Sequence, residues 1–166
     1  MRRLTVFLGL TMVILPVLAL ADRDEHRERG NGVAYMQAAQ YPLYQRECGS
    51  CHLAYPPRLL PDASWQRIMD GLADHFGDNA ELAATDRDLI RDFLRRNAGK
   101  PRSESVLKIT ELRWFRHEHD RFSRKMVQDN KDVGRLSRCE ACHTDAPTGH
   151  FRESRIRIPG YGRWDD

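Results

Sequence analysis

Two short motifs in the sequence each combine two thiols with an imidazole. Cys48-Gly49-Ser50-Cys51-His52 and Cys139-Glu140-Ala141-Cys142-His143 share the pattern C-x-x-C-H, which is typical of covalent c-type haem attachment. Thiols three residues apart lie on neighbouring sides of one helical turn, where each can add to one of the two vinyl groups of a porphyrin. The histidine that follows is then placed to bind the iron as an axial ligand. The predicted attachment residues are Cys48, Cys51, Cys139 and Cys142, and the predicted proximal ligands are His52 and His143.

Three other interpretations of the four cysteines are weaker. A redox C-x-x-C of the thioredoxin type would follow a strand in a βαβ unit, and neither motif has that context. A single zinc ion bound by both motifs would need half-sites about 12–20 residues apart. The two motifs are 91 residues apart. Two disulfides would leave both following histidines unexplained, so the sequence predicts two covalently bound haem c groups with iron.

The first 21 residues have the pattern of a secretory signal peptide. Two arginines precede an apolar stretch, residues 4–20, and residues 19–21 (Ala-Leu-Ala) match a small-x-small cleavage sequence. The apolar stretch is at the lower limit of the about 17–25 residues that span a bilayer, so an uncleaved anchor is the alternative. Pro16 and the cleavage sequence favour cutting after Ala21, which would place residues 22–166 in the periplasm.

The composition excludes several classes of protein. A chain of 166 residues is the size of one domain, too short for a large multidomain enzyme. Its formal net charge of +3 falls to +1 without the two arginines of the signal peptide, so no basic field indicates nucleic acid as a partner. With 11 Gly and 8 Pro, the chain is neither collagen-like nor of low complexity. The sequence has no second long apolar run, so it predicts no membrane span after cleavage of the signal peptide.

The pattern beyond the signal peptide predicts a mostly α fold, small and organised by haem, with long loops and little or no sheet. No stretch alternates convincingly enough for a strand. Ser64 is the expected N-cap of a helix over 65–76, which Gly77 would end, and Thr85 or Asp86 is the expected cap of the next helix. The predicted helices cover residues 33–40, 65–76, 86–97 and 110–127, and the second motif lies in a turn over 134–143.

The two motifs divide the mature chain into an N-terminal haem lobe, residues 22–100, and a C-terminal haem lobe, residues 101–166. So many loops leave a thin apolar core. Each haem would therefore act as a large apolar side chain in its lobe.

The remaining histidines are candidates for the sixth iron position. The predicted helix over 65–76 carries an apolar stripe with helical spacing of 3, 4 and 3 residues, which consists of Trp65, Ile68, Leu72 and His75. His75 is therefore the expected distal ligand of the first haem, and Met69 is its chief rival.

The second lobe repeats this pattern. The stripe there consists of Leu112, Phe115, His119 and Phe122. His119 is the expected distal ligand of the second haem. His117, displaced by about 160° around the helix, is the reserve candidate, and Met126 and His150 are weaker alternatives.

On these motifs the sequence resembles the dihaem cytochrome c family, small exported cytochromes with bis-histidine haems. The resemblance covers most of residues 42–160 and is most specific over 48–82, with further portions at 109–119 and 139–159. In that family the histidine of the segment matching Asp74-His75-Phe76-Gly77 binds the first haem. The histidine of the segment Trp-Phe-x-x-Glu-His binds the second. The resemblance thus implies His75 and His119 as ligands, and as partners either a small high-spin monohaem cytochrome or a membrane cytochrome b.

The leading functional hypothesis is a periplasmic cytochrome that passes single electrons between redox partners through two low-spin bis-histidine haems, and not an enzyme. Histidine in place of methionine as distal ligand should keep the reduction potentials low. A charged rim could tune encounters with partners; its candidate residues are Arg152, Arg155, Arg157 and Arg163. The alternatives are a haem peroxidase or reductase and a gas-binding sensor. Both need one haem whose distal face can open.

Overall fold

The computed structural model describes residues 33–100 and 106–164. The predicted signal peptide lies outside the described residues. The α-helices of the described part are α2 (Tyr41–Cys48), α3 (Asp62–Asp70), α4 (Ala84–Asn97) and α5 (Arg113–Glu118). The described part also contains short 3₁₀ helices: η1 (Ala34–Gln37), η2 (Pro57–Leu59), η3 (Leu72–Asp74), η4 (Ile109–Glu111), η5 (Arg124–Met126), η6 (Cys139–Ala141), η7 (Ala146–Thr148) and η8 (Glu153–Arg155).

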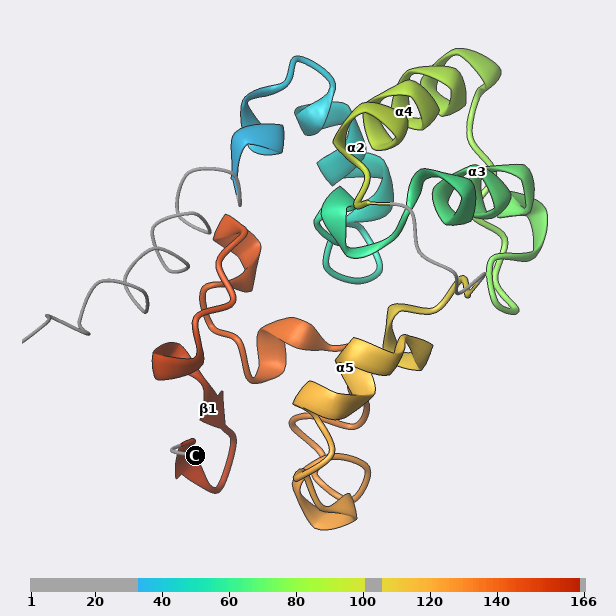
Figure 1. The fold of residues 1–166 in the computed structure, drawn as a ribbon. Coiled ribbons are helices and arrows are strands. Elements are labelled where there is room, and N and C mark those ends of the chain that lie inside the picture. The colour runs from blue at the N-terminus through green and yellow to red at the C-terminus, as the bar shows by residue number, and fades with distance from the viewer. Residues whose placement is uncertain (1–32, 101–105, 165–166) are drawn as a thin grey trace, which may run out of the picture.

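Helices α2, α3 and α4 pack together in the first half of the chain (Figure 1). The centre of this core is the face of α4 that carries Ile90, Phe93 and Leu94, all fully buried. Tyr44 of α2 packs against Phe93 with ring centres 5.1 Å apart. Trp65, from the buried face of α3, also donates its indole N–H to the Pro57 carbonyl at 2.6 Å. The helices therefore bury one continuous apolar cluster, which continues into Leu112 and Phe115 of the second half.

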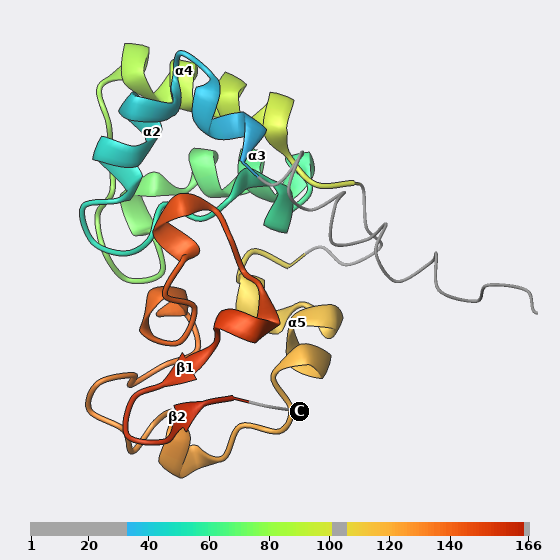
Figure 2. The same cartoon turned by 90° about the vertical axis from the view of Figure 1, so that its left-hand side faces the viewer.

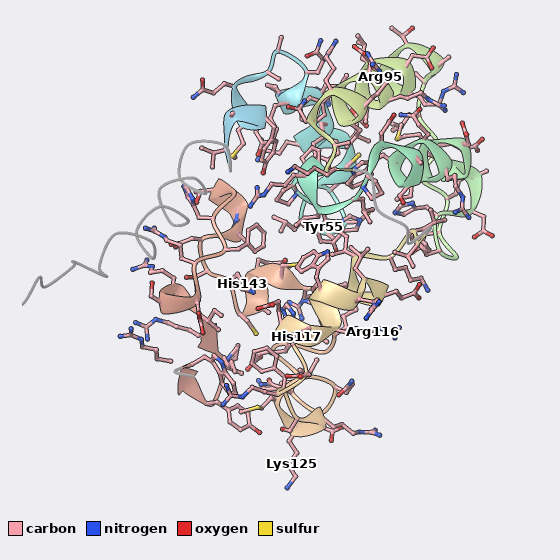
Figure 3. The ribbon with its side chains drawn as sticks, viewed as in Figure 1. Tyr55, Arg95, Arg116, His117, Lys125 and His143 are labelled. Carbon is pink, nitrogen blue, oxygen red and sulfur yellow. The ribbon has the colours of Figure 1, made fainter. Side chains whose placement is uncertain are left out.

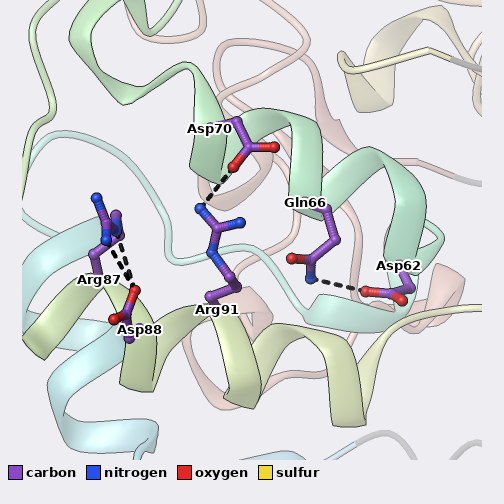
Figure 4. Close-up of polar contacts among 6 residues, drawn as sticks. All are labelled: Asp62, Gln66, Asp70, Arg87, Asp88 and Arg91. Carbon is purple, nitrogen blue, oxygen red and sulfur yellow. Dashed lines mark hydrogen bonds and ion pairs between the residues drawn. The ribbon is translucent and has the colours of Figure 1, made fainter. Parts of the chain in front are cut away.

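An ion pair also joins α3 to α4 on their outer side. Arg91 of α4 reaches Asp70, the last residue of α3, at 2.7 Å (Figure 4). Because the Asp70 side chain is 64% exposed, solvent screens the pair and it stabilises the fold only slightly. The other polar contacts in this view, Gln66 with Asp62 and Arg87 with Asp88, lie within single helices.

The second half of the chain is built mainly of loops and single turns of 3₁₀ helix (Figure 2). Its sheet consists of β1 (Arg157–Ile158) and β2 (Gly162–Arg163), paired antiparallel with Arg157 opposite Arg163. The expectation of a mostly α fold with long loops and little sheet is confirmed.

The predicted helix over 65–76 is wrong at both ends. Helix α3 begins at Asp62 and ends at Asp70, where the Gly71 amide bonds both the Arg67 and the Ile68 carbonyls. Ser64 is not a cap, because it lies inside the helix and its hydroxyl donates to the Val106 carbonyl at 2.8 Å. Within the helix the apolar stripe therefore ends at Ile68, because Leu72 lies on η3 and His75 follows it.

The predicted helix over 110–127 is also wrong. Only α5, six residues long, is α-helical, and it is preceded by η4 and followed by η5. The residues after α5 are mostly polar, and the backbone leaves the helical region at His119, with φ −120° and ψ 13°.

The remaining boundaries differ less. The predicted helix over 33–40 is the shorter η1, and a helix not anticipated, α2, starts at Tyr41 with Pro42 in its first turn, where proline is favourable. Helix α4 ends at Asn97 as expected, but it begins at Ala84 without a side-chain cap from Thr85 or Asp86.

None of the helices in residues 33–100 and 106–164 has the length and apolar character needed to span a bilayer.

Gly99 closes the first half of the chain against the loop after the first motif. Its amide donates to the Leu60 carbonyl at 2.8 Å, and a Cβ at this position would lie 2.2 Å from the Arg58 carbonyl oxygen. The obstructing atom belongs to the backbone, so it cannot rotate away.

We expect Gly99→Ala to lower the free energy of unfolding of the haem-loaded protein by about 1–3 kcal/mol, the usual cost of overpacking. Urea unfolding measures the loss. Gly71→Ala is the matched control, because its new Cβ would make only an ordinary contact, 3.4 Å from the Arg67 carbonyl oxygen. Equal stability of the Gly99→Ala variant and the wild type would contradict this account of the loop.

Candidate haem sites

The first C-x-x-C-H motif starts on the last residue of α2 and continues into a turn. Cys48 ends the helix, and the Gly49 amide closes it with a 2.9 Å bond to the Gln45 carbonyl. Ser50 then donates its hydroxyl to the Glu47 carbonyl at 3.2 Å. These bonds turn the chain so that Cys51 and His52 follow Cys48 within a single compact loop.

His52 and His75 face one another across the first site. Their ring centres are 6.2 Å apart, and their planes are inclined by 21°. The Nδ1–H of His52 donates to the Leu53 carbonyl at 2.7 Å. This bond leaves Nε2 as the ring nitrogen that can bind a metal, an arrangement common among metal-binding histidines.

A tight turn, and not a helix, presents His75. The His75 amide donates to the Asp78 carbonyl at 2.7 Å, and the Asp78 amide donates back at 3.3 Å. Phe76 and Gly77 between them have φ of 59° and 106°, so both central residues have left-handed backbone. Asp74 supports the turn by accepting the Gly77 amide at 2.9 Å. The first distal candidate is thus held by backbone geometry that helical periodicity does not describe.

The second motif lies on η6 and is held by the C-terminal tail. The His143 amide donates to the Cys139 carbonyl at 2.8 Å, which closes a turn around the motif. The Arg157 amide donates to the Cys142 carbonyl at 3.0 Å, and His143 pairs with Ile156 in an isolated bridge. The C-terminal tail therefore positions this motif.

His143 faces His119 across the second site. Their ring centres are also 6.2 Å apart, but their planes are inclined by 60°. The Nδ1–H of His119 donates to the Phe115 carbonyl at 2.8 Å. In a continuing helix the backbone amide of residue 119 would occupy this carbonyl, so the imidazole takes the place of a helical hydrogen bond. The Phe115 ring stacks on the His119 ring at 3.9 Å and fixes its plane.

The other candidate ligands lie elsewhere. The side chain of His117 is 82% exposed and has Glu118 as its charged neighbour at 3.8 Å. Met69 is 3% exposed and packs in the apolar cluster of the helices. Met126 lies on η5, and His150 follows the left-handed Gly149. The structure thus brings His75 to His52 and His119 to His143.

Burial determines the protonation of these groups. It lowers the pKa values of His75 and His119, and it lowers that of His143 to about 4, with a smaller contribution from the charge of His119. The three imidazoles are therefore neutral at physiological pH, which is the form that binds metal.

The thiols respond to burial in the opposite direction. Burial raises the pKa values of Cys48 and Cys139 to about 12, assisted by the carboxylates of Glu47 and Glu140, and it raises that of Cys142 as well. The uncharged thioethers that haem attachment creates suit these surroundings, because burial disfavours a thiolate. All four cysteines are free, and no three metal-binding side chains converge anywhere in the described part of the chain.

A cavity of about 360 Å³ lies beside the first motif, and both halves of the chain form its walls. Tyr35, Tyr41 and Gln45 line it from the first half, next to Cys51 and His52. The second half contributes Glu140, Ala146 and Pro147.

These features fit a metal held between two imidazoles in each site. A histidine nitrogen lies about 2 Å from the metal that it binds and about 1 Å from the centre of its own ring. Two imidazoles on opposite sides of one metal therefore have ring centres about 6 Å apart. Both histidine pairs have this separation. His143 also has a buried Nδ1 without a hydrogen-bond partner, so this imidazole is not committed to the protein at that atom.

The fold and the two motifs define a class of protein, small helical cytochromes with two haem-attachment sites. The family model described as dihaem cytochrome c matches residues 44–151. The chain belongs to this family, and its cofactors are two covalently attached c-type haems with iron. A search of curated proteins finds no match.

Solved structures with the same fold are dihaem cytochromes. The X-ray structure of a diheme cytochrome type c from Shewanella baltica OS155 is similar, with 45% identity and a TM-score of 0.71, over 77% of this chain and 100% of that chain. A second similar structure, described as DHC purified from Rhodobacter sphaeroides, has 41% identity and a TM-score of 0.60, over 66% of this chain and 96% of that chain. A diheme cytochrome c from Rhodobacter sphaeroides has 38% identity and the same TM-score.

Sequence reasoning missed two contributors to the sites. Tyr55 stacks on His52 with ring centres 4.8 Å apart. Its aromatic side chain three residues after the first motif is the sequence feature that could have indicated this contact. Ile156 pairs with His143 in a bridge beside the hydrogen bond from the Arg157 amide to the Cys142 carbonyl, which no pattern of residue types indicates.

The pairing of each motif with one haem is directly testable. We expect the double variant Cys48→Ser/Cys51→Ser to retain one covalent haem, because it removes both thioether bonds of one site only. Native mass spectrometry counts the haems. Cys139→Ser/Cys142→Ser is the reciprocal control and should also retain one. Two haems in either variant would show that the thiols are not the attachment points.

Proposed function

We propose that this protein is a periplasmic electron carrier, not an enzyme, and that His52 with His75 and His143 with His119 are the axial ligands of its two haems. When bound, each haem iron supplies a one-electron couple. The chain supplies four imidazoles and the hydrogen bonds that orient two of them.

The observation that carries the proposal is the equal separation of 6.2 Å in both histidine pairs. A protein ligand on both faces of a haem favours electron transfer, whereas an open face favours gas binding or catalysis. Each proximal histidine of this chain is faced by a second imidazole, so neither site offers the vacant coordination position that a peroxidase or a sensor requires.

The proposed location and partners depend on the sequence. Residues 1–21 have the pattern of a cleaved signal peptide, and family resemblance favours exchange with a small high-spin monohaem cytochrome or a membrane cytochrome b.

The surface of the second half is less basic than its arginines suggested. Arg152 and Arg155 both contact Asp145, at 3.6 and 3.1 Å, and Arg155 lowers the pKa of that carboxyl.

Carbon monoxide distinguishes a carrier from an enzyme or a sensor. We expect the visible spectrum of the reduced protein to be unchanged after addition of the gas, because two imidazoles occupy both axial positions of each haem. A shift of the low-spin bands that accounts for one haem would identify an open distal face and overturn the carrier proposal.

Substitution of the distal histidines tests the ligand assignment. We expect His75→Met and His119→Met each to raise the potential of one haem by roughly 0.1–0.2 V, within the about 0.8 V that axial ligands span. Spectroelectrochemistry measures the potentials. Electron paramagnetic resonance should also show the loss of one of two distinct low-spin signals, since imidazole planes inclined by 21° and 60° produce different ligand fields.

His117→Met is the matched control for these variants. Its side chain is 82% exposed, so both potentials and both signals should be unchanged. If His117→Met altered one haem and His119→Met did not, the second distal ligand would be His117.

A further inference from the structure

Tyr55 lies where the two halves of the chain meet (Figure 3). Its ring stacks on the imidazole of His52, with centres 4.8 Å apart and planes inclined by 20°. Its hydroxyl donates to the carbonyl of Ser137 at 2.7 Å, a contact between residues 82 positions apart in the sequence. A single side chain therefore contacts the proximal ligand of the first site and the backbone that leads into the second.

The acceptor of this bond lies next to the second haem attachment. Ser137 precedes Cys139 by two residues, and the Cys139 Sγ lies 3.8 Å from the same Ser137 carbonyl oxygen. The Tyr55 hydroxyl and the attachment sulfur thus share one carbonyl group. Contacting atoms run from the His52 ring through the Tyr55 ring and hydroxyl to the Ser137 carbonyl and the Cys139 sulfur.

The first half of the chain fixes Tyr55 in this position. Tyr44, buried in the helical core, donates its hydroxyl to the Tyr55 carbonyl at 2.7 Å. Two prolines follow Tyr55, which restricts its backbone to extended conformations. Burial and the nearby Cys139 and Glu140 raise the pKa of Tyr55 to about 12, so its hydroxyl keeps the proton that it donates.

We propose that Tyr55 is a positioning residue that couples the two haem sites, so that electron exchange between them depends on its ring contact with His52 and its hydrogen bond to Ser137. The inference rests on the proposed electron-carrier function. In the exchange one electron leaves the reduced haem of one site, which is oxidised, and reduces the oxidised haem of the other. Tyr55 itself is neither oxidised nor deprotonated, and no co-reactant is consumed.

The coupling has a physical basis in how electrons tunnel. The probability of transfer falls much less steeply through covalent and hydrogen bonds than across gaps between atoms that are not bonded. The Tyr55 hydroxyl replaces such a gap with a bond of 2.7 Å. The same bond fixes the distance between the two motifs, since it holds Ser137 against a side chain that is itself packed on His52.

The test compares Tyr55→Phe with Tyr44→Phe in the protein carrying both haems. Each variant removes one tyrosine hydroxyl that donates to a backbone carbonyl at 2.7 Å, but only the Tyr55 bond reaches the second site. One electron is injected into the oxidised protein by flash photoreduction, and its redistribution between the haems is followed by absorbance. Spectroelectrochemistry and thermal unfolding are recorded in parallel.

We expect Tyr55→Phe to slow the redistribution severalfold, with both low-spin spectra retained and the difference between the two potentials unchanged. Tyr55→Leu, which also removes the ring contact with His52, should slow it further. Tyr44→Phe removes a bond to the Tyr55 backbone but leaves the partners of the Tyr55 ring and hydroxyl in place, so it should lower the unfolding temperature by a similar amount and slow the redistribution much less than Tyr55→Phe does.

Equal rates in Tyr55→Phe and the wild type would overturn the coupling role and leave the carrier function intact. Equal slowing by Tyr55→Phe and Tyr44→Phe would also overturn it, because the effect would then be a general loss of stability. A wild-type protein in which the electron does not redistribute at all would also overturn the coupling role, whereas failure of the carrier function would appear separately as a shift of the reduced spectrum with carbon monoxide.

Discussion

The structure depends on one constraint, that each of two imidazoles fixed by a C-x-x-C-H motif must face a second imidazole across about 6 Å. The surrounding elements serve this geometry in different ways. A two-residue turn with left-handed backbone carries His75, and the end of a short helix carries His119. The bridge between Ile156 and His143 holds the second motif from the far end of the chain. Equivalent pairs thus arise from unrelated local structures.

Burial gives the two sites their chemical character. Histidines removed from water remain neutral, and thiols removed from water remain protonated, because a low dielectric disfavours the charged form of either group. Among the histidines the effect is largest at His143, whose pKa falls to about 4. The same surroundings thus suit neutral metal ligands and uncharged thioether links, and both are what covalent haem requires.

The two halves of the chain share a wall, and the first half does not enclose the cavity beside its motif alone. Residues of both line the cavity beside the first motif. Gly149 of the second half lies against η1, where a Cβ would come within 3.0 Å of Val33. The close approach needs glycine, both for space and for its φ of 77°. The two halves therefore contact one another both beside the first motif and at η1.

The attachment motifs, the mostly α class and the two cofactors followed from the sequence by itself, because thioether formation needs cysteines and a histidine that are contiguous in the chain. The ends of α3 and α5 did not follow, because Gly71 and the His119 side chain end these helices through hydrogen bonds that periodicity does not register. Helical spacing and family resemblance assigned His75 to the first site, but only the tertiary structure showed the turn that presents it to His52 and the contact of Tyr55 with Ser137. The contact of Tyr55 with Ser137 joins residues 82 positions apart, and it forms only when the chain has closed around both sites.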